Sequence, residues 1–223
     1  VLFISDRSGT FKIYKQAIDQ TTPELVAGDS SNLAIPRLSP DGTEVLYEVY
    51  SNKWEQVSHV HPIMRVPLGG GAAQEVLEAM ELVNHQCSRA PATICVYSQA
   101  EKDALTLFTF DPVQGNPKQI LRVKDDLPYS YHWTHSPNGA MLAIAKRLDL
   151  PAESSIRIVP LDGGAERSIR VTGWSGIYGM DWAADSKSLR VSANVSDDET
   201  RLLNISLDGH VTPEFLNSQI EVG

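Results

Sequence analysis

Short stretches in which apolar and polar residues alternate recur along the whole chain. Clear examples are residues 44–50 (EVLYEVY), 93–99 (TICVYSQ), 140–146 (AMLAIAK) and 188–195 (SLRVSANV). Successive side chains of a strand point to opposite faces, so alternation with a period of two predicts half-buried β-strands. A turn signal precedes most of these stretches, and Gly, Pro, Asn and Asp separate them from the next. The pattern predicts an all-β protein built from antiparallel hairpins.

The hairpins repeat at a fixed spacing. If the first residue of each turn is the anchor, the anchors lie 47 to 49 residues apart and are Ser39, Ser88, Ser136 and Ala183. After each alternating strand come a third strand with a Gly-containing turn and a shorter fourth run. A period in the forties with four strands per unit is typical of β-propeller blades. We therefore predict a β-propeller of four-stranded antiparallel blades, with about five blades in this chain.

The repeat also predicts where the units begin and end. Aligning VLFIS on VLYEV places Val1 on Val45, so the chain begins at the second strand of a blade. Propellers often close by completing one blade from both termini, which removes free sheet edges. We expect one propeller over residues 1–223, divided into a part blade 1–29, units of about 30–82, 83–125, 126–172 and 173–216, and the start of a next strand at 217–223.

Several segments resemble a known family. FISDRSGTFKIYKQAID followed by IPRLSPDGTEVLY resembles the TolB-type, Pro-Asp-repeat β-propellers of bacteria. HQCSRAPATICVYS, GWSGIYGMDWAADSKSL and LLNISLDGHV are similar to the C-terminal propellers of bacterial winged-helix regulators and Ser/Thr kinases, especially those of acidobacteria. The resemblance implies a sensing or protein-interaction module behind a signalling domain. Six blades are usual in the TolB group, so the chain is either a truncated six-bladed ring or a five-bladed ring that lacks one strand.

Composition narrows the choice of partners. The chain has 223 residues, 42% of them hydrophobic, which is enough for a sizeable core, and its net charge is -9. An acidic surface repels phosphate backbones, so we expect this segment not to bind nucleic acid. No apolar run approaches the roughly 18 residues needed to span a bilayer, and no signal peptide is visible. We expect a protein or peptide partner, with a small ligand as a second option, and no cofactor.

Candidate catalytic motifs have simpler structural interpretations. GWSGIYG (173–179) resembles the G-x-S-x-G nucleophile elbow, but the position two beyond Ser175 is Ile177, and a strand-turn-helix context is missing. His59 and His61 could supply two metal ligands, but the sequence places no third ligand beside them. The chain alone is therefore predicted to have no catalytic centre and no metal site.

The first strand of each blade offers candidate binding residues. The position two before each anchor is polar in every unit, and the position directly before it is mostly bulky. We interpret the polar set as side chains that line a solvent-filled central channel: Arg37, Gln86, Thr134 and Asp181. The bulky set, Leu38, Cys87, His135 and Trp182, is expected to pack between blades. Nearby loops are rich in aromatic residues that can anchor a partner or simply pack: Tyr129, Tyr131, His132, Trp174 and Tyr178.

The turn of one unit has lost its Pro-Asp-Gly pattern. That hairpin contains the only two cysteines, Cys87 and Cys95, which the repeat alignment sets at the places of Leu38 and Leu46. Cross-strand neighbours lie close enough for a disulfide after a small adjustment, so we predict a Cys87–Cys95 bond; two buried free thiols are the alternative. A disulfide would indicate an oxidising compartment such as the periplasm, while a cytoplasmic location stays open.

The sequence thus predicts a non-catalytic β-propeller module for binding or sensing, within a larger bacterial regulatory protein. The alternative is the accessory propeller of a prolyl-oligopeptidase-type serine hydrolase.

Overall fold

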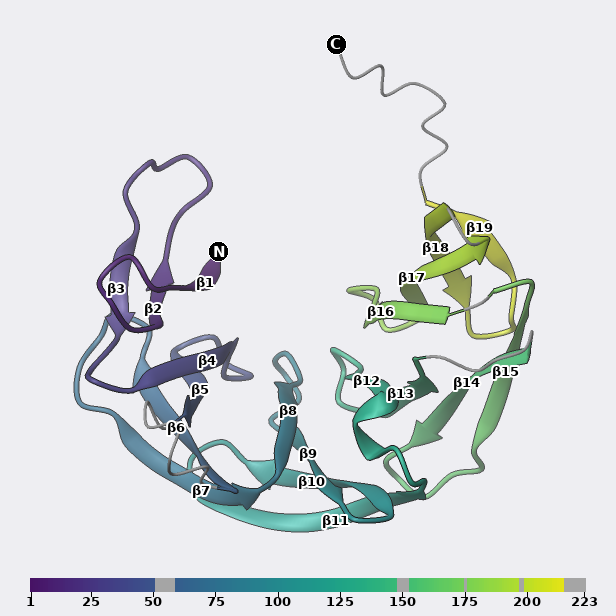
Figure 1. The fold of residues 1–223 in the computed structure, drawn as a ribbon, viewed down its shortest axis with the longest axis horizontal. Helices are drawn as coiled ribbons and strands as arrows, with labels where there is room; N and C mark the ends of the chain where they lie inside the picture. Colours follow the sequence, from purple (N-terminus) through teal and green to yellow (C-terminus); the bar gives the residue numbers. More distant parts are fainter. Residues whose placement is uncertain (51–58, 148–152, 175, 197–198, 215–223) are drawn as a thin grey trace. The chain divides into compact units, whose positions relative to one another are not determined.

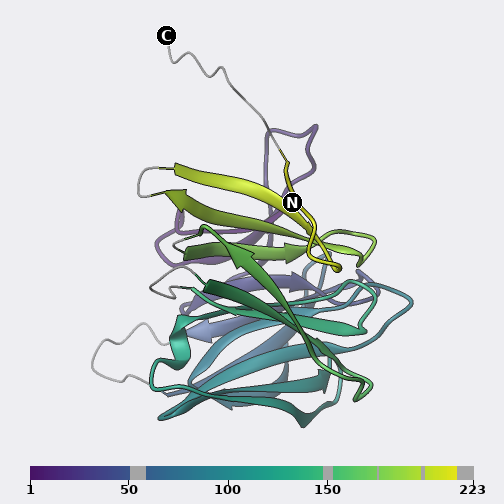
Figure 2. The same ribbon diagram turned by 90° about the vertical axis from the view of Figure 1, so that its right-hand side faces the viewer.

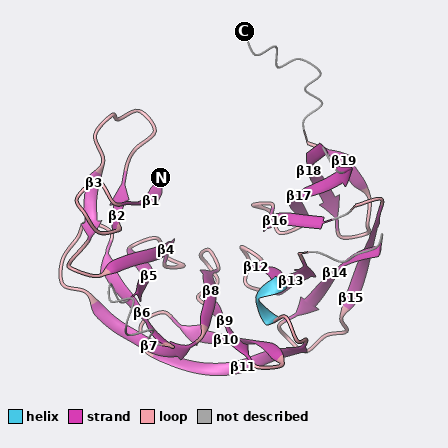
Figure 3. Ribbon diagram, viewed as in Figure 1, coloured by secondary structure: helices cyan, strands magenta, loops and turns pink. Residues whose placement is uncertain are grey.

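The structure is a computed structural model that describes residues 1–50, 59–147, 153–174, 176–196 and 199–214. Almost all regular elements are strands, and one short 3-10 helix, η1 (Pro128–Ser130), is the exception among the described residues (Figure 3). The chain divides into two compact units, residues 1–129 (unit 1) and 130–223 (unit 2). We describe each unit by itself.

Unit 1 contains three antiparallel sheets, A, B and C (Figure 1). Sheet A has three described strands, and sheets B and C have four strands each in chain order. The strands of sheet A are β1 (Leu2–Ser5), β2 (Lys12–Lys15) and β3 (Glu24–Ala27). Those of sheet B are β4 (Asn32–Leu38), β5 (Glu44–Tyr50), β6 (Val60–Pro67) and β7 (Gln74–Met80). Those of sheet C are β8 (Leu82–Cys87), β9 (Cys95–Glu101), β10 (Ala104–Asp111) and β11 (Gly115–Lys124).

Unit 2 contains two four-stranded antiparallel sheets, D and E, again in chain order. Figure 2 shows their strands running side by side with a marked twist. The strands of sheet D are β12 (Tyr131–His135), β13 (Met141–Lys146), β14 (Glu153–Pro160) and β15 (Arg167–Thr172). Those of sheet E are β16 (Gly176–Trp182), β17 (Ser188–Ser196), β18 (Glu199–Ser206) and β19 (Val211–Pro213). These antiparallel meanders are propeller blades, so the predicted all-β propeller fold is confirmed.

The Ser-Pro-Asp-Gly turn is held by its own side chains. The Ser39 hydroxyl donates to the Asp41 carboxylate at 2.6 Å and accepts the Glu44 amide at 3.0 Å. The same carboxylate accepts the amide of Thr43, and these hydrogen bonds lower the pKa of Asp41, the bond from Ser39 most of all. Gly42 has a φ of 75°, a conformation that favours glycine. The turn chemistry therefore fixes where β4 ends and β5 begins.

The two diverged turns behave differently. The 183–186 turn, whose type the sequence left open, keeps the hydrogen bond from the fourth amide to the first carbonyl, and Ser186 takes the left-handed conformation (φ 61°) in place of glycine. The 88–94 connection is one residue longer, because Ser88 bonds Ile94 where Ser39 bonds Glu44. Cys95 therefore occupies the place of Val45 and not that of Leu46, which corrects the alignment.

Neighbouring turns are also bonded to each other. In unit 1 the Ala90 amide donates to the carbonyl of Pro40 at 2.9 Å, which joins the turns of sheets C and B. In unit 2 the Asn138 amide donates to the hydroxyl of Ser186 at 3.1 Å, which joins the turns of sheets D and E. Sheets B and C, and likewise sheets D and E, are thus linked at the turns between their first two strands.

The core lies between facing blades. In unit 2 one cluster of buried residues joins both sheets and includes Ile156, Ile158, Trp174, Ile177, Leu189 and Ile205. In unit 1 sheets A and B share Ile13, Val26, Leu33, Val45, Tyr47 and Val66, while sheets B and C share Leu46, Ile63, Ala79, Tyr97 and Phe110. Burial of these apolar faces is the main driving force for stacking the blades.

Candidate functional site

The four residues predicted to line a channel differ in their exposure to solvent. Arg37 and Asp181 are exposed and Gln86 is half-buried, whereas Thr134 is fully buried. The Thr134 hydroxyl donates to the Asp181 carboxylate at 3.0 Å, which joins the first strands of sheets D and E. Thr134 therefore does not face solvent, and its role as a channel residue is corrected: its hydroxyl is occupied in a contact between blades.

The four bulky residues that directly precede the anchors also differ in their burial. His135 and Trp182 are buried, and the indole nitrogen of Trp182 donates to the carbonyl of Thr134 at 3.1 Å. Cys87 is half-buried, but Leu38 is 45% exposed. Packing between blades therefore holds for the residues of unit 2 and does not hold for Leu38.

Tyr129 is an exposed aromatic side chain with a fixed hydroxyl. Its ring is 57% exposed, and its hydroxyl donates to Glu81 at 2.8 Å. The other carboxylate oxygen of Glu81 bonds the Nδ1 atom of His59. The bond from Tyr129 is the largest of the effects that lower the pKa of Glu81, and the bond with His59 acts in the same direction. The carboxylate is thus held ionised between an imidazole and a phenol at the surface of unit 1.

Tyr178 has a similar arrangement in unit 2. It is 49% exposed, and its hydroxyl accepts a hydrogen bond from the side-chain amide of Asn194 at 2.9 Å. The carbonyl oxygen of the same side chain accepts from the Thr200 hydroxyl at 2.7 Å. The ring is thus oriented from its polar end while one face stays open to solvent.

The remaining aromatic candidates are less accessible. Trp174 is buried in the core of unit 2, so its interpretation as a binding residue is corrected to one of packing. Tyr131 and His132 are half-buried on β12. Burial lowers the pKa of His132, and the charge of Arg147 acts in the same direction. Burial also lowers the pKa of His135, to about 4. These histidines are neutral near pH 7.

Histidines 59 and 61 do not form a metal site in the described part of the chain. His59 bonds Glu81, whereas His61 lies within β6 and stacks on Tyr50 with ring centroids 4.6 Å apart. β6 begins at Val60 and includes Pro62. No three His, Cys, Asp or Glu side chains of the described residues gather around a point that could hold a metal ion.

One residue pair that the sequence did not single out forms a fully buried hydrogen bond between a carboxylate and an imidazole. Glu48 on β5 and His85 on β8 approach to 2.9 Å with no solvent exposure of either side chain. Tyr50 donates to the second carboxylate oxygen of Glu48 at 2.7 Å. A lone histidine two residues before a cysteine gives no signal in sequence, because its partner lies 37 residues away. The pair joins blades B and C inside the core.

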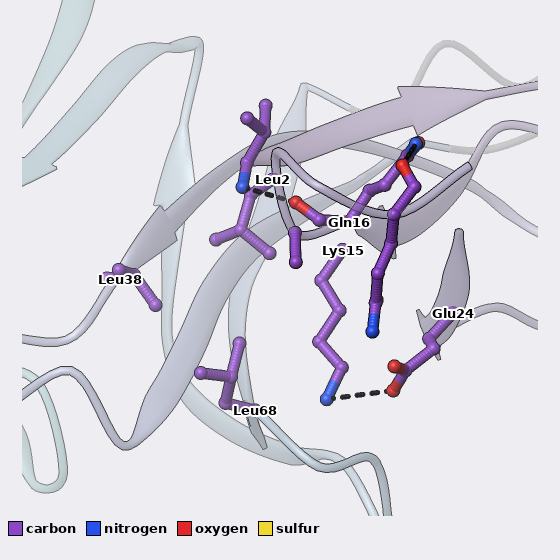
Figure 4. A pocket seen from close by; sticks show the side chains of 9 residues that line it. Leu2, Lys15, Gln16, Glu24, Leu38 and Leu68 are labelled. Carbon is purple, nitrogen blue, oxygen red and sulfur yellow. Dashed lines mark hydrogen bonds and ion pairs between the residues drawn. The ribbon is translucent and has the colours of Figure 1, made fainter. Parts of the chain in front are cut away.

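Unit 1 also has a pocket of about 540 Å³ beside the free edge of β1, which we call the strand-edge pocket (Figure 4). Leu2 of β1, Leu38 at the end of β4 and Leu68 in the turn after β6 form its apolar wall. Lys15 and Glu24 form an ion pair of 3.1 Å on the opposite side. The other lining residues are Val1, Gln16, Ala17 and Gln20.

The two cysteines are bonded in the structure. Cys87 and Cys95 lie directly opposite each other in the β8–β9 register and form a disulfide. The bond closes the hairpin whose turn lacks the Pro-Asp-Gly sequence. Ser175, the serine of the elbow-like motif, lies outside the described residues.

Searches for relatives by sequence gave no match: no family model and no curated protein matches the chain. Solved structures match over nearly the whole chain. TolB from Acinetobacter baumannii has a TM-score of 0.73 at 12% identity, covering 95% of this chain and 51% of that one. The putative TolB from Agrobacterium tumefaciens has a TM-score of 0.64 at 18% identity, covering 86% and 65%. An acylaminoacyl peptidase from Pyrococcus horikoshii has a TM-score of 0.60 at 13% identity, covering 96% and 36%.

These matches establish the fold as a β-propeller of the kind seen in TolB. The chain spans between about a third and two thirds of the length of these structures. At such low identity a similar fold does not carry an activity or a partner with it. In the described residues no helix is long and apolar enough to cross a membrane.

Proposed function

We propose that this chain is a non-catalytic binding module for a protein or peptide partner within a larger bacterial regulatory protein. The observation that carries the proposal is a pair of exposed tyrosines whose hydroxyls are fixed by hydrogen bonds, Tyr129 to Glu81 and Tyr178 to Asn194. A rigid exposed aromatic ring offers a large contact area and loses little conformational entropy on binding. The regulatory setting rests on the resemblance to propellers of winged-helix regulators and kinases.

The proposal is tested by quantitative capture of proteins from a bacterial extract. The wild-type chain is compared with Tyr129→Ala, with Tyr178→Ala and with Val113→Ala, which changes an exposed residue far from either tyrosine in sequence. Loss of a binding anchor should weaken a genuine partner by about 30-fold or more, corresponding to about 2 kcal/mol. Proteins whose capture depends on Tyr129 or on Tyr178, and not on Val113, support the proposal. Identical capture by all four proteins contradicts it.

The alternative function is that of an accessory propeller in a prolyl-oligopeptidase-type serine hydrolase. The fold match to the Pyrococcus horikoshii acylaminoacyl peptidase supports it. The parent gene distinguishes the two: a winged-helix or kinase domain upstream favours a regulator, and an α/β-hydrolase domain downstream favours the hydrolase. For the chain alone we expect no labelling by a fluorophosphonate probe, and acylation of Ser175 would contradict the non-catalytic function.

We further propose an oxidising compartment, such as the periplasm, for the native protein. The disulfide between Cys87 and Cys95 supports it, because such bonds are rare in reducing compartments. Alkylation of thiols in intact cells followed by mass spectrometry tests it. Two modified cysteines in the native host would contradict an oxidising location.

A further inference from the structure

Glu81 is held by four hydrogen bonds in an unfavourable backbone conformation. It is the single residue between β7 and β8, and its φ of 45° lies in the left-handed region that residues with a side chain seldom adopt. Its amide donates to the carbonyl of His59 at 2.6 Å, and its carbonyl accepts the amide of Ala100 at 2.9 Å. Its carboxylate oxygens bond the side chains of His59 and Tyr129. Strained residues of this kind cluster at functional sites, so Glu81 is a candidate for binding.

The Glu81 carboxylate keeps acceptor capacity for a ligand. An ionised carboxylate oxygen can accept two hydrogen bonds, and among the described residues each of these oxygens has one partner, His59 or Tyr129. The side chain of Glu81 is 36% exposed, so the group is open to solvent. An exposed anion whose orientation is fixed before binding favours a ligand that carries positive charge and donates hydrogen bonds.

The ring of Tyr129 adds an open aromatic face beside this anion. Its hydroxyl is bound to Glu81, while the residue is 57% exposed. Elsewhere in unit 1 a tyrosine ring carries a guanidinium, since the Cζ atom of Arg7 lies 4.8 Å from the ring centroid of Tyr14. No aromatic or cationic side chain within the described ranges stacks on Tyr129 in this way. The Tyr129 face can therefore accept a cation from another molecule.

The segment that carries Tyr129 is itself ordered by local hydrogen bonds. The amide of Leu127 donates to the Asp125 carboxylate at 2.8 Å, and the Asp125 amide donates to the carbonyl of Asp103 at 2.9 Å. Leu127 is 64% exposed. The segment thus brings an exposed apolar side chain and two acidic residues, Asp125 and Asp126, close to Tyr129 in sequence. This combination suits a side chain with an apolar stem and a cationic end.

We propose that Glu81 and Tyr129 form a binding site for an arginine side chain of the partner protein or peptide. The inference rests on the proposed function, because it names the partner chemistry that one of the two exposed tyrosines recognises. The guanidinium stacks on the open face of Tyr129 and donates to the Glu81 carboxylate, and its aliphatic stem packs against Leu127. Lysine fits less well, because an ammonium has no planar group that can stack and donate at the same time.

A set of matched peptides tests the proposal on the unaltered chain. The probes are the acetylated and amidated peptide Ala-Ala-Arg-Ala-Ala and its versions with lysine or citrulline at the centre; citrulline has the shape of arginine without its charge. Binding is followed by NMR titration of the chain with isotope-labelled tyrosine rings, and the signal of Tyr129 is identified by its absence from Tyr129→Phe. We expect the arginine peptide to shift this signal and to bind at least about 10-fold more tightly than the citrulline peptide, with lysine between them.

Two variants separate the carboxylate from the ring. Glu81→Gln keeps the shape of the side chain and removes its charge, so it should weaken binding of the arginine peptide about 10-fold or more. Glu75→Gln is the matched control, because it removes an exposed carboxylate from the preceding strand β7 with the same change in net charge. It should leave the affinity within about twofold of wild type, since solvent and salt screen a distant surface charge.

Several outcomes would overturn the arginine site. They are no detectable binding of the arginine peptide, equal binding of the citrulline peptide, an unshifted Tyr129 signal, and equal losses in Glu81→Gln and Glu75→Gln. The comparison of peptides decides the question even where Glu81→Gln does not fold. A protein captured from the bacterial extract through Tyr129, but equally well by wild type and Glu81→Gln, would remove the arginine site and leave the proposed binding function standing.

Discussion

The contact between sheets B and C in unit 1 and the contact between sheets D and E in unit 2 have residues of opposite polarity at equivalent positions. Between sheets B and C, Glu48 and His85 form a fully buried hydrogen bond between a carboxylate and an imidazole. Between sheets D and E, the corresponding residues are Ala145 and Met180, which pack in an apolar core. The backbone registers are the same, so the fold does not require either solution.

The comparison shows that the repeat determines the strand register but does not determine whether the residues between two blades are polar or apolar. A buried polar pair must recover the cost of removing its polar groups from water, whereas an apolar contact has no such cost. The stability of the two contacts should therefore respond very differently to single substitutions.

The largest expected effect comes from removing one partner of this buried polar pair. Glu48→Ala should destabilise the protein by about 3–5 kcal/mol, because it leaves the buried imidazole of His85 and the half-buried hydroxyl of Tyr50 without their common acceptor. The double variant Glu48→Ala with His85→Met, which copies the unit 2 pair into unit 1, should recover most of that loss. Urea unfolding of the three proteins measures the difference. Equal stability of the single and double variants would contradict the assigned role of these buried hydrogen bonds.

A pH effect of about 3 kcal/mol is expected from a residue of unit 2. Burial lowers the pKa of His135 from 6.5 to about 4, so the unfolded chain binds the proton more tightly than the folded one. The contribution is fully present above pH 6.5 and is lost as the pH falls from 6.5 to about 4. Between pH 6.5 and about 4 the stability of wild type should fall by about 3 kcal/mol more than that of His135→Phe, measured by urea unfolding at each pH. An unchanged pH dependence in the variant would show that His135 is not the source.

The disulfide of unit 1 should have a smaller effect. It closes a loop of 8 residues, and a bond of this span stabilises by about 2–3 kcal/mol through the unfolded chain. We expect no titratable thiol in the unfolded, unreduced protein and a matching loss of stability in the Cys87→Val, Cys95→Val variant. Two titratable thiols would contradict the bond, and an unchanged stability would contradict its contribution.

The smallest effect concerns the turns. Gly42→Ala should cost about 1 kcal/mol, since φ is positive there while no atom lies within 4 Å of the added Cβ. Gly69→Ala is the matched control, because it has equal space and no positive φ. Equal stability of the two variants would show that the left-handed turn, shared with Ser186 in unit 2, is not the cause of the cost.

Periodicity was enough to predict the fold and the position of nearly every hairpin. The four anchors depend on local turn chemistry, and the alternating strands that follow them depend on burial of one face. The turn residues and the alternation of apolar and polar residues can both be recognised in the sequence. The displacement of Cys95 by one residue could not be recognised, because the inserted residue lies in a turn that has no Gly and whose proline, Pro91, does not stand directly after the anchor as Pro40 does.

The candidate site was predicted less well, for a physical reason. A polar position two before each anchor indicates a shared register, but solvent exposure also depends on the neighbouring blade. Thr134 is buried, and its hydroxyl donates a hydrogen bond to Asp181 of the next blade. The Glu48–His85 pair depends on residues 37 positions apart in different repeats. Such contacts follow from packing, which periodicity does not contain.

The hydrogen bonds between neighbouring turns determine where the chain tolerates a foreign sequence. A peptide tag inserted at residues 39–42 would displace the Pro40 carbonyl that Ala90 binds, and so would disturb two blades at once. The turn around Val113 is exposed, and the amides of Val113 and Gln114 bond Asp111 of the same hairpin. A fluorescent or affinity tag therefore belongs in this hairpin loop, where the added length would stay local to a single blade.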